Sequence, residues 1–395
     1  MTTVTSPSGP AANARPFLHG TELAAIGRVL ETGQYGHGHE TDAFESELAA
    51  HLGVDDVVAV ATGTAALHLA LLAAGVGPGD EVVVPSLTFC ASVQAILATG
   101  AQPRFVDVDP ATLCVTAEHI QTALTSATRA VMPVLYGGRA VDLAPIRDQL
   151  AERDIAVVED AAHAFGSLTA GRRVGATGDL TCFSFDAIKA LTCGDGGAIV
   201  PRHPAEADQL RRARLLGMTS PREQRVQTVS YLVAVPGFRY HLSTLHAAIG
   251  RVQLTHFDEV TACRRHLWRS YATALANVPG VVLVDLDVAN TVPFNCVVRV
   301  PASVRDTVHA RLHAAGIQAG VHYPPNHLQP AFARWSRSLP ATEAVASEIL
   351  SLPFHPNLTD ADLTFVVTAL AAAVSAEPAA LHRGKAVPAG QPGVR

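Results

Sequence analysis

Short apolar runs alternate along the chain with longer stretches in which apolar residues recur every three or four positions. The short runs predict strands over residues 56–62, 81–85, 103–108, 130–135, 155–159, 180–185 and 197–201. Most of them are apolar at nearly every position, which is typical of parallel strands buried on both faces. The pattern therefore predicts an α/β protein with a mainly parallel sheet covered by helices on both sides.

The helical pattern predicts helices over residues 21–32, 40–52, 64–74, 89–98, 117–124 and 143–153. A long helical stretch over 244–278 leads to a second set of elements, with strands over 281–286 and 295–300 and helices over 305–315, 341–350 and 360–375. We expect a large domain over 15–255 and a smaller C-terminal α/β domain over 256–378. Residues 1–14 and 379–395 are rich in Pro, Gly, Ser and Ala, which predicts flexible tails.

Composition narrows the possible classes of protein. Charged residues make up only 16% of the 395 residues and the net charge is −6, which argues against nucleic acid as a partner. The six cysteines form no C-x-x-C pair, so a zinc site or redox pair is not expected. The N-terminus lacks the pattern of a signal peptide, and the apolar stretches do not indicate a membrane span. These features predict a cytoplasmic protein.

Candidate chemistry follows the predicted strands, where ligands bind in sheets of this kind. Gly63, Thr64 and Ala65 open a helix directly after a strand, and such a helix start suits either a phosphate or a simple Thr cap. This helix start is not a Walker loop, because it has no GK[ST]. No G-x-G-x-x-G follows a strand either, which disfavours a nicotinamide-dependent oxidoreductase.

Two ionisable residues at later strand ends have more specific implications. Asp160 ends a buried strand, where a carboxylate is costly unless it is paired, for example with a protonated ring nitrogen. Lys189 lies in an apolar, glycine-containing loop, and burial there would lower its pKa and free its amine for Schiff-base chemistry. Lys189 and Lys385 are the only lysines among 29 basic residues, so a retained lysine at 189 suggests that a primary amine is needed.

Seven motifs, beginning with ATGTAALHLAL (61–71) and ending with GVHYPPNHLQPAF (320–332), together resemble those of the DegT-type sugar aminotransferases, which are pyridoxal-phosphate (PLP) enzymes of fold type I, the aspartate-aminotransferase fold. The motifs occur in the family's order and span about residues 17–375. They are ATGTAALHLAL (61–71), VPSLTFCASVQAIL (84–97), PRFVDVD (103–109), VVEDAAHAFGS (157–167), CFSFDAIKALTCGDGG (182–197), GFRYHLSTLHAAIGRVQL (237–254) and GVHYPPNHLQPAF (320–332).

The resemblance implies a role for each matched residue. Lys189 would bind PLP covalently and transfer the proton, and Asp160 would pair with the ring nitrogen. Phe89 would stack on the ring, and His163, where many relatives have Gln, would lie near its phenolic oxygen. The cofactor phosphate would be held by Gly63, Thr64, the Ala65 backbone and Ser184. The substrate side would be lined by His322, Tyr323 and His327, although Tyr323 and the prolines after it could also form only a rigid turn.

Arg239 stands where many relatives have an Asn that reaches the phosphate of the partner subunit's cofactor. Arg239 could serve the same phosphate, or it could bind a substrate carboxylate or phosphate instead. The first role requires a homodimer with shared active sites.

The predicted function is therefore a PLP-dependent aminotransferase. It would move an amino group from an amino acid, L-glutamate in most of the family, to a keto-sugar that is nucleotide-linked, in amino-sugar or antibiotic biosynthesis. A cyclitol ketone (an inosose) is the alternative acceptor. The deoxysugar dehydratase branch replaces the lysine with histidine, so Lys189 argues against it. A non-catalytic relative is disfavoured because Lys189, Asp160 and Ser184 are all present.

Metal binding is not expected. His309 and His313 lie four residues apart on a predicted helix, but no third ligand is near them in the sequence. His37 and His39 lie in a glycine-rich loop.

Overall fold

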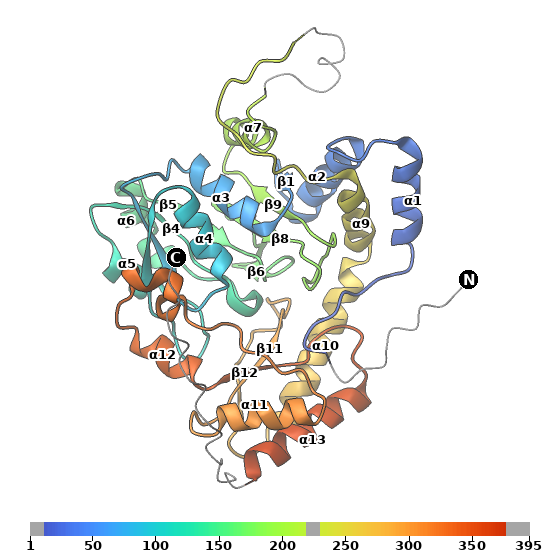
Figure 1. Ribbon diagram of the computed structural model, residues 1–395, viewed down its shortest axis with the longest axis vertical. Coiled ribbons are helices and arrows are strands. Elements are labelled where there is room, and N and C mark those ends of the chain that lie inside the picture. Colours follow the sequence, from blue (N-terminus) through green and yellow to red (C-terminus); the bar gives the residue numbers. More distant parts are fainter. Residues whose placement is uncertain (1–11, 219–229, 377–395) are drawn as a thin grey trace, which may run out of the picture.

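The computed structural model describes residues 12–218 and 230–376 (Figure 1). Its centre is a seven-stranded sheet with the strand order β1-β9-β8-β5-β4-β2-β3. The strands are β1 (Val58–Val60), β2 (Glu81–Pro85), β3 (Gln102–Val106), β4 (Thr128–Val131), β5 (Ala156–Asp160), β8 (Leu180–Ser184) and β9 (Gly197–Val200). Only β9 runs against its neighbours, β1 and β8. The mainly parallel sheet and the fold class predicted from the sequence are confirmed.

Alternate residues of each strand enter different cores, as the two-residue period of a strand requires. Val82 and Val84 face a core shared with helices α3 (Gly63–Ala73), α4 (Cys90–Ala98) and α7 (Pro204–Ala213), whereas Val83 faces a core shared with α5 (Ala117–Ala123) and α6 (Arg147–Glu152). Ala59 likewise faces α2 (His39–Leu52) and α9 (Thr244–Thr255). The sheet is therefore the middle of three layers, and α1 (Glu22–Thr32) packs outside α9.

A second, three-stranded antiparallel sheet has the order β10-β11-β12 and lies below the large sheet in Figure 1. Its strands are β10 (Val282–Leu283), β11 (Cys296–Arg299) and β12 (Ile349–Leu352). One face packs on α10 (Phe257–Leu275), α11 (Arg305–Ala314) and α13 (Asp360–Ser375). The other face, through Val297 and Ile349, packs on residues of the large sheet's loops, so the two sheets share a core.

Several details differ from the sequence prediction. The helix predicted over 341–350 is α12 (Pro340–Ala346) followed by strand β12, because a four-residue segment such as Ile-Leu-Ser-Leu is too short for its pattern to separate a strand from a helix. Helix α7 and the short hairpin β6 (Leu168–Thr169) and β7 (Arg172–Arg173) were not predicted. The long stretch over 244–278 is two helices that meet at His256.

The predicted tails need one correction. Asn13, placed in a flexible tail, donates from its side chain to the Ser351 carbonyl at 2.9 Å and accepts from the Phe354 amide at 2.9 Å. It is therefore anchored beside β12. Residues 379–395 lie outside the described residues, and the domain boundaries at 255 and 378 stay predictions.

Candidate active site

A cavity of about 400 Å³ opens at the carboxyl ends of the parallel strands. Its lining comes from the residues that follow β1, β2, β5 and β8 and from the loop at 322–323. The sequence-predicted residues that line it are Gly63, Thr64, Phe89, Asp160, His163, Ser184, Lys189, His322 and Tyr323. The rule that ligands bind at the carboxyl ends of strands therefore placed most of the candidates in one cavity.

The start of α3 forms one end of the cavity. Thr62 caps this helix by accepting from the Ala65 amide at 3.0 Å. A Cβ at Gly63 would lie 2.7 Å from Ser184 Cβ, so only glycine lets the helix start approach β8 this closely. The first amide groups of a helix have no partner within the helix and attract anions. The Ala65 amide is the exception, because Thr62 already uses it.

Asp160 is the last residue of β5 and is buried. It accepts from Ser92 Oγ at 2.6 Å and from the Ala162 amide at 3.2 Å, and Ser92 Oγ lies 2.9 Å from Thr88 Oγ1. Burial raises the pKa of Asp160, and the Ser92 hydrogen bond opposes this shift. A cationic ring nitrogen in the cavity would stabilise the ionised form further. Sequence reasoning missed Ser92, because no pattern along the chain connects it to residue 160.

Lys189 lies in the loop that connects β8 to β9, where its amide donates to the Asp186 carbonyl at 3.0 Å. Its Nζ lies 4.5 Å from the centroid of the Phe294 ring. Burial lowers the pKa of Lys189 to about 8, although Asp160 and Asp186 oppose the shift. A substantial fraction of the amine is therefore uncharged just above neutral pH, as a nucleophilic lysine requires.

His163 is buried against Phe294, with the two rings stacked at 3.8 Å and 13°. Its Nδ1 accepts from the Gly137 amide at 3.3 Å, and its Nε2 lies 3.0 Å from the Tyr323 hydroxyl. Burial, with smaller effects from Lys189 and His322, holds the pKa of His163 well below its usual range. The ring is therefore neutral at physiological pH. Phe294 was not identified from the sequence.

Phe89 precedes α4 and is 56% exposed, although it is a large apolar residue. It lines the cavity, and its ring lies 5.6 Å from that of Tyr323. An exposed aromatic face at a cavity wall suits stacking on a planar ligand.

His322 lines the cavity, and its Nδ1 lies 2.8 Å from Ser351 Oγ. His327 does not reach the cavity, which corrects the expectation that it lines the substrate side. Its Nδ1 lies 2.7 Å from Ser86 Oγ and its Nε2 lies 3.3 Å from Glu343, so both ring nitrogens are used within the fold. Arg239 is exposed and lies outside the cavity of its own chain.

The structure places the two histidine pairs that were considered for metal binding in separate surroundings. His309 and His313 lie with ring centroids 4.4 Å apart on α11, and His37 Nε2 lies 2.8 Å from Arg214 Nη2. His39 is the first residue of α2.

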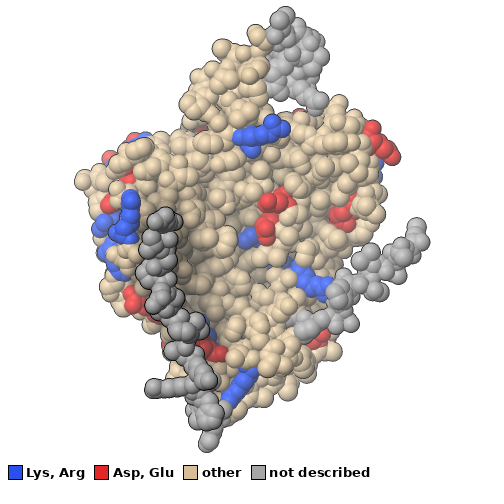
Figure 2. Space-filling view, viewed as in Figure 1, with Lys and Arg blue, Asp and Glu red and all other residues tan. Residues whose placement is uncertain are grey.

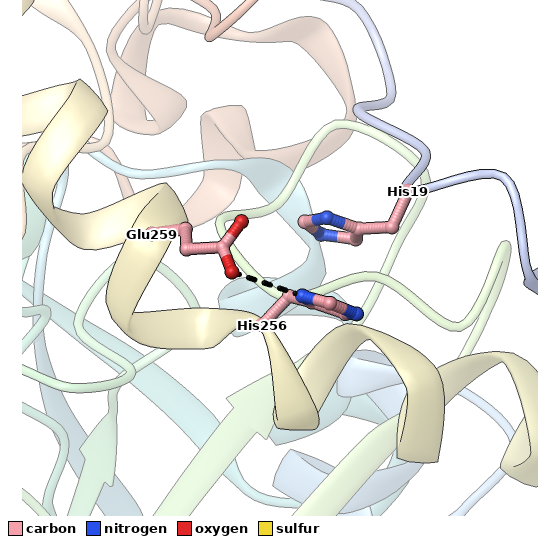
Figure 3. Close-up of side chains that lie close together, drawn as sticks. All are labelled: His19, His256 and Glu259. Atoms are coloured by element: carbon pink, nitrogen blue, oxygen red, sulfur yellow. Dashed lines mark hydrogen bonds and ion pairs between the residues drawn. The ribbon is translucent and has the colours of Figure 1, made fainter.

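A third group, not seen from the sequence, brings ring nitrogens of His19 and His256 and a carboxylate oxygen of Glu259 within 4.8 Å of one another (Figure 3). The two rings are stacked at 4.2 Å and 14°. Lone pairs of imidazole lie in the ring plane, so two nearly parallel rings do not aim at one ion. His256 Nδ1 also lies 3.1 Å from Glu259 Oε1. We therefore interpret the group as a set of contacts that hold the segment before α1 against the junction of α9 and α10.

Within the described residues, no helix has both the length and the apolar character needed to cross a bilayer. On the face shown in Figure 2, charged side chains are scattered between wide uncharged areas.

A lysine with a lowered pKa, a buried carboxylate, a helix start and an exposed aromatic ring around one cavity are the features of a PLP enzyme of fold type I. Comparison with known proteins identifies the family. Residues 17–371 match the DegT/DnrJ/EryC1/StrS aminotransferase family, and the chain belongs to it. The protein is thus a PLP-dependent aminotransferase.

Solved structures agree with this assignment. The aminotransferase TlmJ from Streptoalloteichus hindustanus is 38% identical, with 92% of this chain and 98% of that chain covered and a TM-score of 0.86. The sugar aminotransferase CalS13 from Micromonospora echinospora is 32% identical, with 92% and 99% covered and a TM-score of 0.85. The PLP form of Spr1654 from Streptococcus pneumoniae, a putative sugar aminotransferase by its description, is 25% identical, with 91% and 97% covered and a TM-score of 0.85.

Proposed function

We propose that this aminotransferase moves an amino group from L-glutamate to a ketone on a nucleotide-linked deoxysugar. The observation that carries the proposal is the placement of Lys189 and Asp160 on one cavity that the start of α3 also lines. Its similarity to CalS13, described as a sugar aminotransferase, supports a sugar as the acceptor.

The residues around the cavity fit PLP. The close approach of Gly63 to Ser184 leaves a hydroxyl and free helix amides at one end, which suits the phosphate. Phe89 offers an aromatic face for the ring, and Asp160 offers a carboxylate for the ring nitrogen. When bound, PLP supplies an electron sink that lowers the cost of removing a proton from the substrate carbon next to nitrogen.

The chain's own residues supply the rest of the chemistry. The Lys189 amine, which burial makes easier to deprotonate, would attach the cofactor and afterwards accept and return the substrate proton. Ser92 Oγ and the Ala162 amide each donate to one oxygen of Asp160, so the carboxylate is held in place on the cavity, where it would pair with the ring nitrogen. Asp186 also lines the cavity and, like Asp160, places negative charge near Lys189.

Arg239 is part of the proposal through a second subunit. The structure leaves it exposed and away from its own cavity, which is compatible with a role in the partner's site. We propose a homodimer in which Arg239 of each subunit binds the phosphate in the other site.

The six unpaired cysteines also support the cytoplasm as the place where the enzyme works.

The acceptor is tested by supplying L-glutamate with a panel of nucleotide-linked keto-deoxysugars and of free inososes. Mass spectrometry then follows conversion of ketone to amine together with formation of 2-oxoglutarate. Amination of a nucleotide-linked sugar supports the proposal. Amination of an inosose alone would replace the acceptor class without affecting the assignment as an aminotransferase.

The shared site is tested by coexpressing Lys189→Ala and Arg239→Ala chains that carry different tags. A mixed dimer would hold one site with both residues intact, so it should recover up to about half of the activity that the two parent variants lack. A mixed dimer as inactive as its parents would contradict the shared site.

A further inference from the structure

Three groups form a hydrogen-bonded path from the core into the cavity. The Gly137 amide donates to His163 Nδ1 at 3.3 Å, and His163 Nε2 lies 3.0 Å from the Tyr323 hydroxyl. Tyr323 lines the cavity. The path therefore ends on a hydroxyl that faces the ligand space.

The direction of the hydrogen bonds along this path is fixed. A backbone amide can only donate, so His163 Nδ1 carries no proton. The neutral ring then has its single proton on Nε2, which donates to the Tyr323 oxygen. Stacking on Phe294 at 3.8 Å prevents the ring from turning without disturbing the packing.

Tyr323 is left with a proton to donate. Burial raises the pKa of Tyr323, so its hydroxyl stays protonated. Its only hydrogen-bonding partner among the described residues is His163, which gives a proton and takes none. The hydroxyl hydrogen is therefore free to bond to an acceptor in the cavity.

We propose that Tyr323, oriented by His163, donates the hydrogen bond to the phenolic oxygen of bound PLP. This inference rests on the proposed function. The family resemblance gives the contact to His163 itself, but the one donor of His163 is already engaged with Tyr323. Tyr323 lies beside Phe89, the expected stacking residue, with the ring centroids 5.6 Å apart. His163 is then a positioning residue, and Tyr323 touches the cofactor.

The test uses the pH dependence of the visible absorbance of the holoenzyme. A hydrogen-bond donor stabilises negative charge on the phenolic oxygen of PLP. The proton that titrates beside this oxygen is then held less strongly, so its pKa is lower. Tyr323→Phe should move the midpoint of the absorbance transition upward by about one pH unit, the effect of losing one hydrogen bond to a charged group. Tyr271→Phe is the matched control, because it removes a buried hydroxyl bonded to the Pro353 carbonyl away from the cavity. It should leave the midpoint unchanged.

The midpoints of wild type and Tyr323→Phe can be compared only if the other titratable groups near these residues stay in place. Those that face His163 and Tyr323 are Lys189, His322, Asp160, Asp186, Tyr136 and Cys90. Tyr323→Phe removes one oxygen and no charge, so it leaves all of them in place.

A second variant separates donation from structural support. In His163→Gln the amide side chain carries two hydrogen-bond donors and can itself donate to the ring oxygen. Adding Tyr323→Phe to His163→Gln should then move the midpoint by less than about a third of its effect in the wild-type background. Equal shifts in both backgrounds would overturn the role of His163 as the group that orients Tyr323.

Nitrogen NMR of [¹⁵N]histidine-labelled protein adds a readout that does not depend on cofactor chemistry. The signals lost in His163→Gln should show a neutral ring protonated on Nε2 between pH 6 and 9. A ring protonated on Nδ1, or an unmoved midpoint in Tyr323→Phe, would overturn the inference. A wild-type protein that gains no visible band with PLP would instead overturn the proposed function, and this inference with it.

Discussion

Arg214 and Lys189 are both enclosed cations, but only Arg214 is paired. Its two terminal nitrogens contact the Glu45 carboxylate, the Ala59 carbonyl and His37 Nε2, and it is 2% exposed. Lys189 forms no hydrogen bond or ion pair through Nζ with the described residues and contacts the Phe294 ring instead. The charge of Arg214 is therefore satisfied by partners within the fold, whereas the amine of Lys189 is directed to the cavity.

The surroundings of these two cations show how a fold keeps stability and chemistry apart. Glu45 ties α2 to β1 by accepting from the Ala59 amide at 2.8 Å, and Arg214 joins both to the end of α7. Burying such a charge without its partner costs several kcal/mol. At Lys189 the same physical cost appears as a lowered pKa, which is useful for a nucleophile. Substitutions in the two regions should therefore have opposite signatures.

The largest effect is expected for Lys189→Ala. In the proposed function it removes the amine that would attach PLP and transfer the proton, so turnover should fall by about 10³-fold or more. Steady-state rates and the visible spectrum measure this loss. Lys385→Ala, which changes the chain's other lysine, should keep wild-type activity. Near wild-type turnover in Lys189→Ala would refute the assignment of Lys189.

Asp160→Asn should lower turnover by about 10²-fold, because it removes the charge that would keep the ring nitrogen protonated in the proposed function. Its thermal midpoint should not fall, since the change relieves a buried carboxylate. Glu159→Gln is a close control, because the neighbouring side chain bonds to Thr181 Oγ1 at 2.7 Å and does not line the cavity. If both variants lose activity equally, the position of Asp160 on the cavity is not what matters.

Glu45→Ala should show the reverse pattern. Loss of the carboxylate leaves Arg214 buried without its anion, which should lower the free energy of unfolding by about 3–5 kcal/mol. Denaturant titration of the holoenzyme checks this value, and turnover per folded molecule should stay near wild type. Asp56→Ala, which removes a partly exposed partner of Arg211, should cost less than about 1 kcal/mol. Equal losses of unfolding free energy in Glu45→Ala and Asp56→Ala would mean that burial does not strengthen the pair of Arg214 and Glu45.

The pKa of Lys189 near 8 predicts how the protein without cofactor takes up PLP. Only the uncharged amine reacts, so the rate of covalent uptake should rise roughly tenfold per pH unit below pH 8 and level off above it. Stopped-flow absorbance between pH 6 and 9.5 measures the profile. A rate that still rises steeply above pH 9 would mean that the amine keeps its usual pKa.

Gly63→Ala should have the smallest effect. The new Cβ would lie 2.7 Å from Ser184 Cβ, so the helix start must move away from the phosphate position. We expect the dissociation constant of PLP to rise about tenfold, which corresponds to the loss of one good hydrogen bond. Gly77→Ala, where a Cβ meets nothing within 4 Å, is the control and should bind PLP normally.

The sequence predicted the site residues that lie at or just after the ends of strands. Asp160, Ser184 and Lys189 follow apolar runs, and the topology of a parallel sheet brings such positions together. Residues that act across the fold were not predictable in this way. Ser92 is 68 positions from Asp160, and Arg214 is 169 from Glu45, so no local pattern connects either pair.

The loop at 320–332 shows a different limit. Its motif identified three candidates, yet His322 and Tyr323 line the cavity while His327 is buried beside Ser86. A motif fixes the path of the backbone more than the direction of each side chain, which depends on neighbours from β2 and α12. The partnership of His163 with Tyr323, 160 positions apart, likewise appears only once the fold is known.

The most direct test is the visible spectrum of the purified protein with PLP, recorded before and after addition of L-glutamate. We predict a yellow band that is absent in Lys189→Ala and that bleaches when glutamate is added, with one equivalent of 2-oxoglutarate formed per site. A wild-type protein that gains no band, or a band that Lys189→Ala retains unchanged, would contradict the claim that Lys189, in the loop after β8, makes this cavity an aminotransferase site.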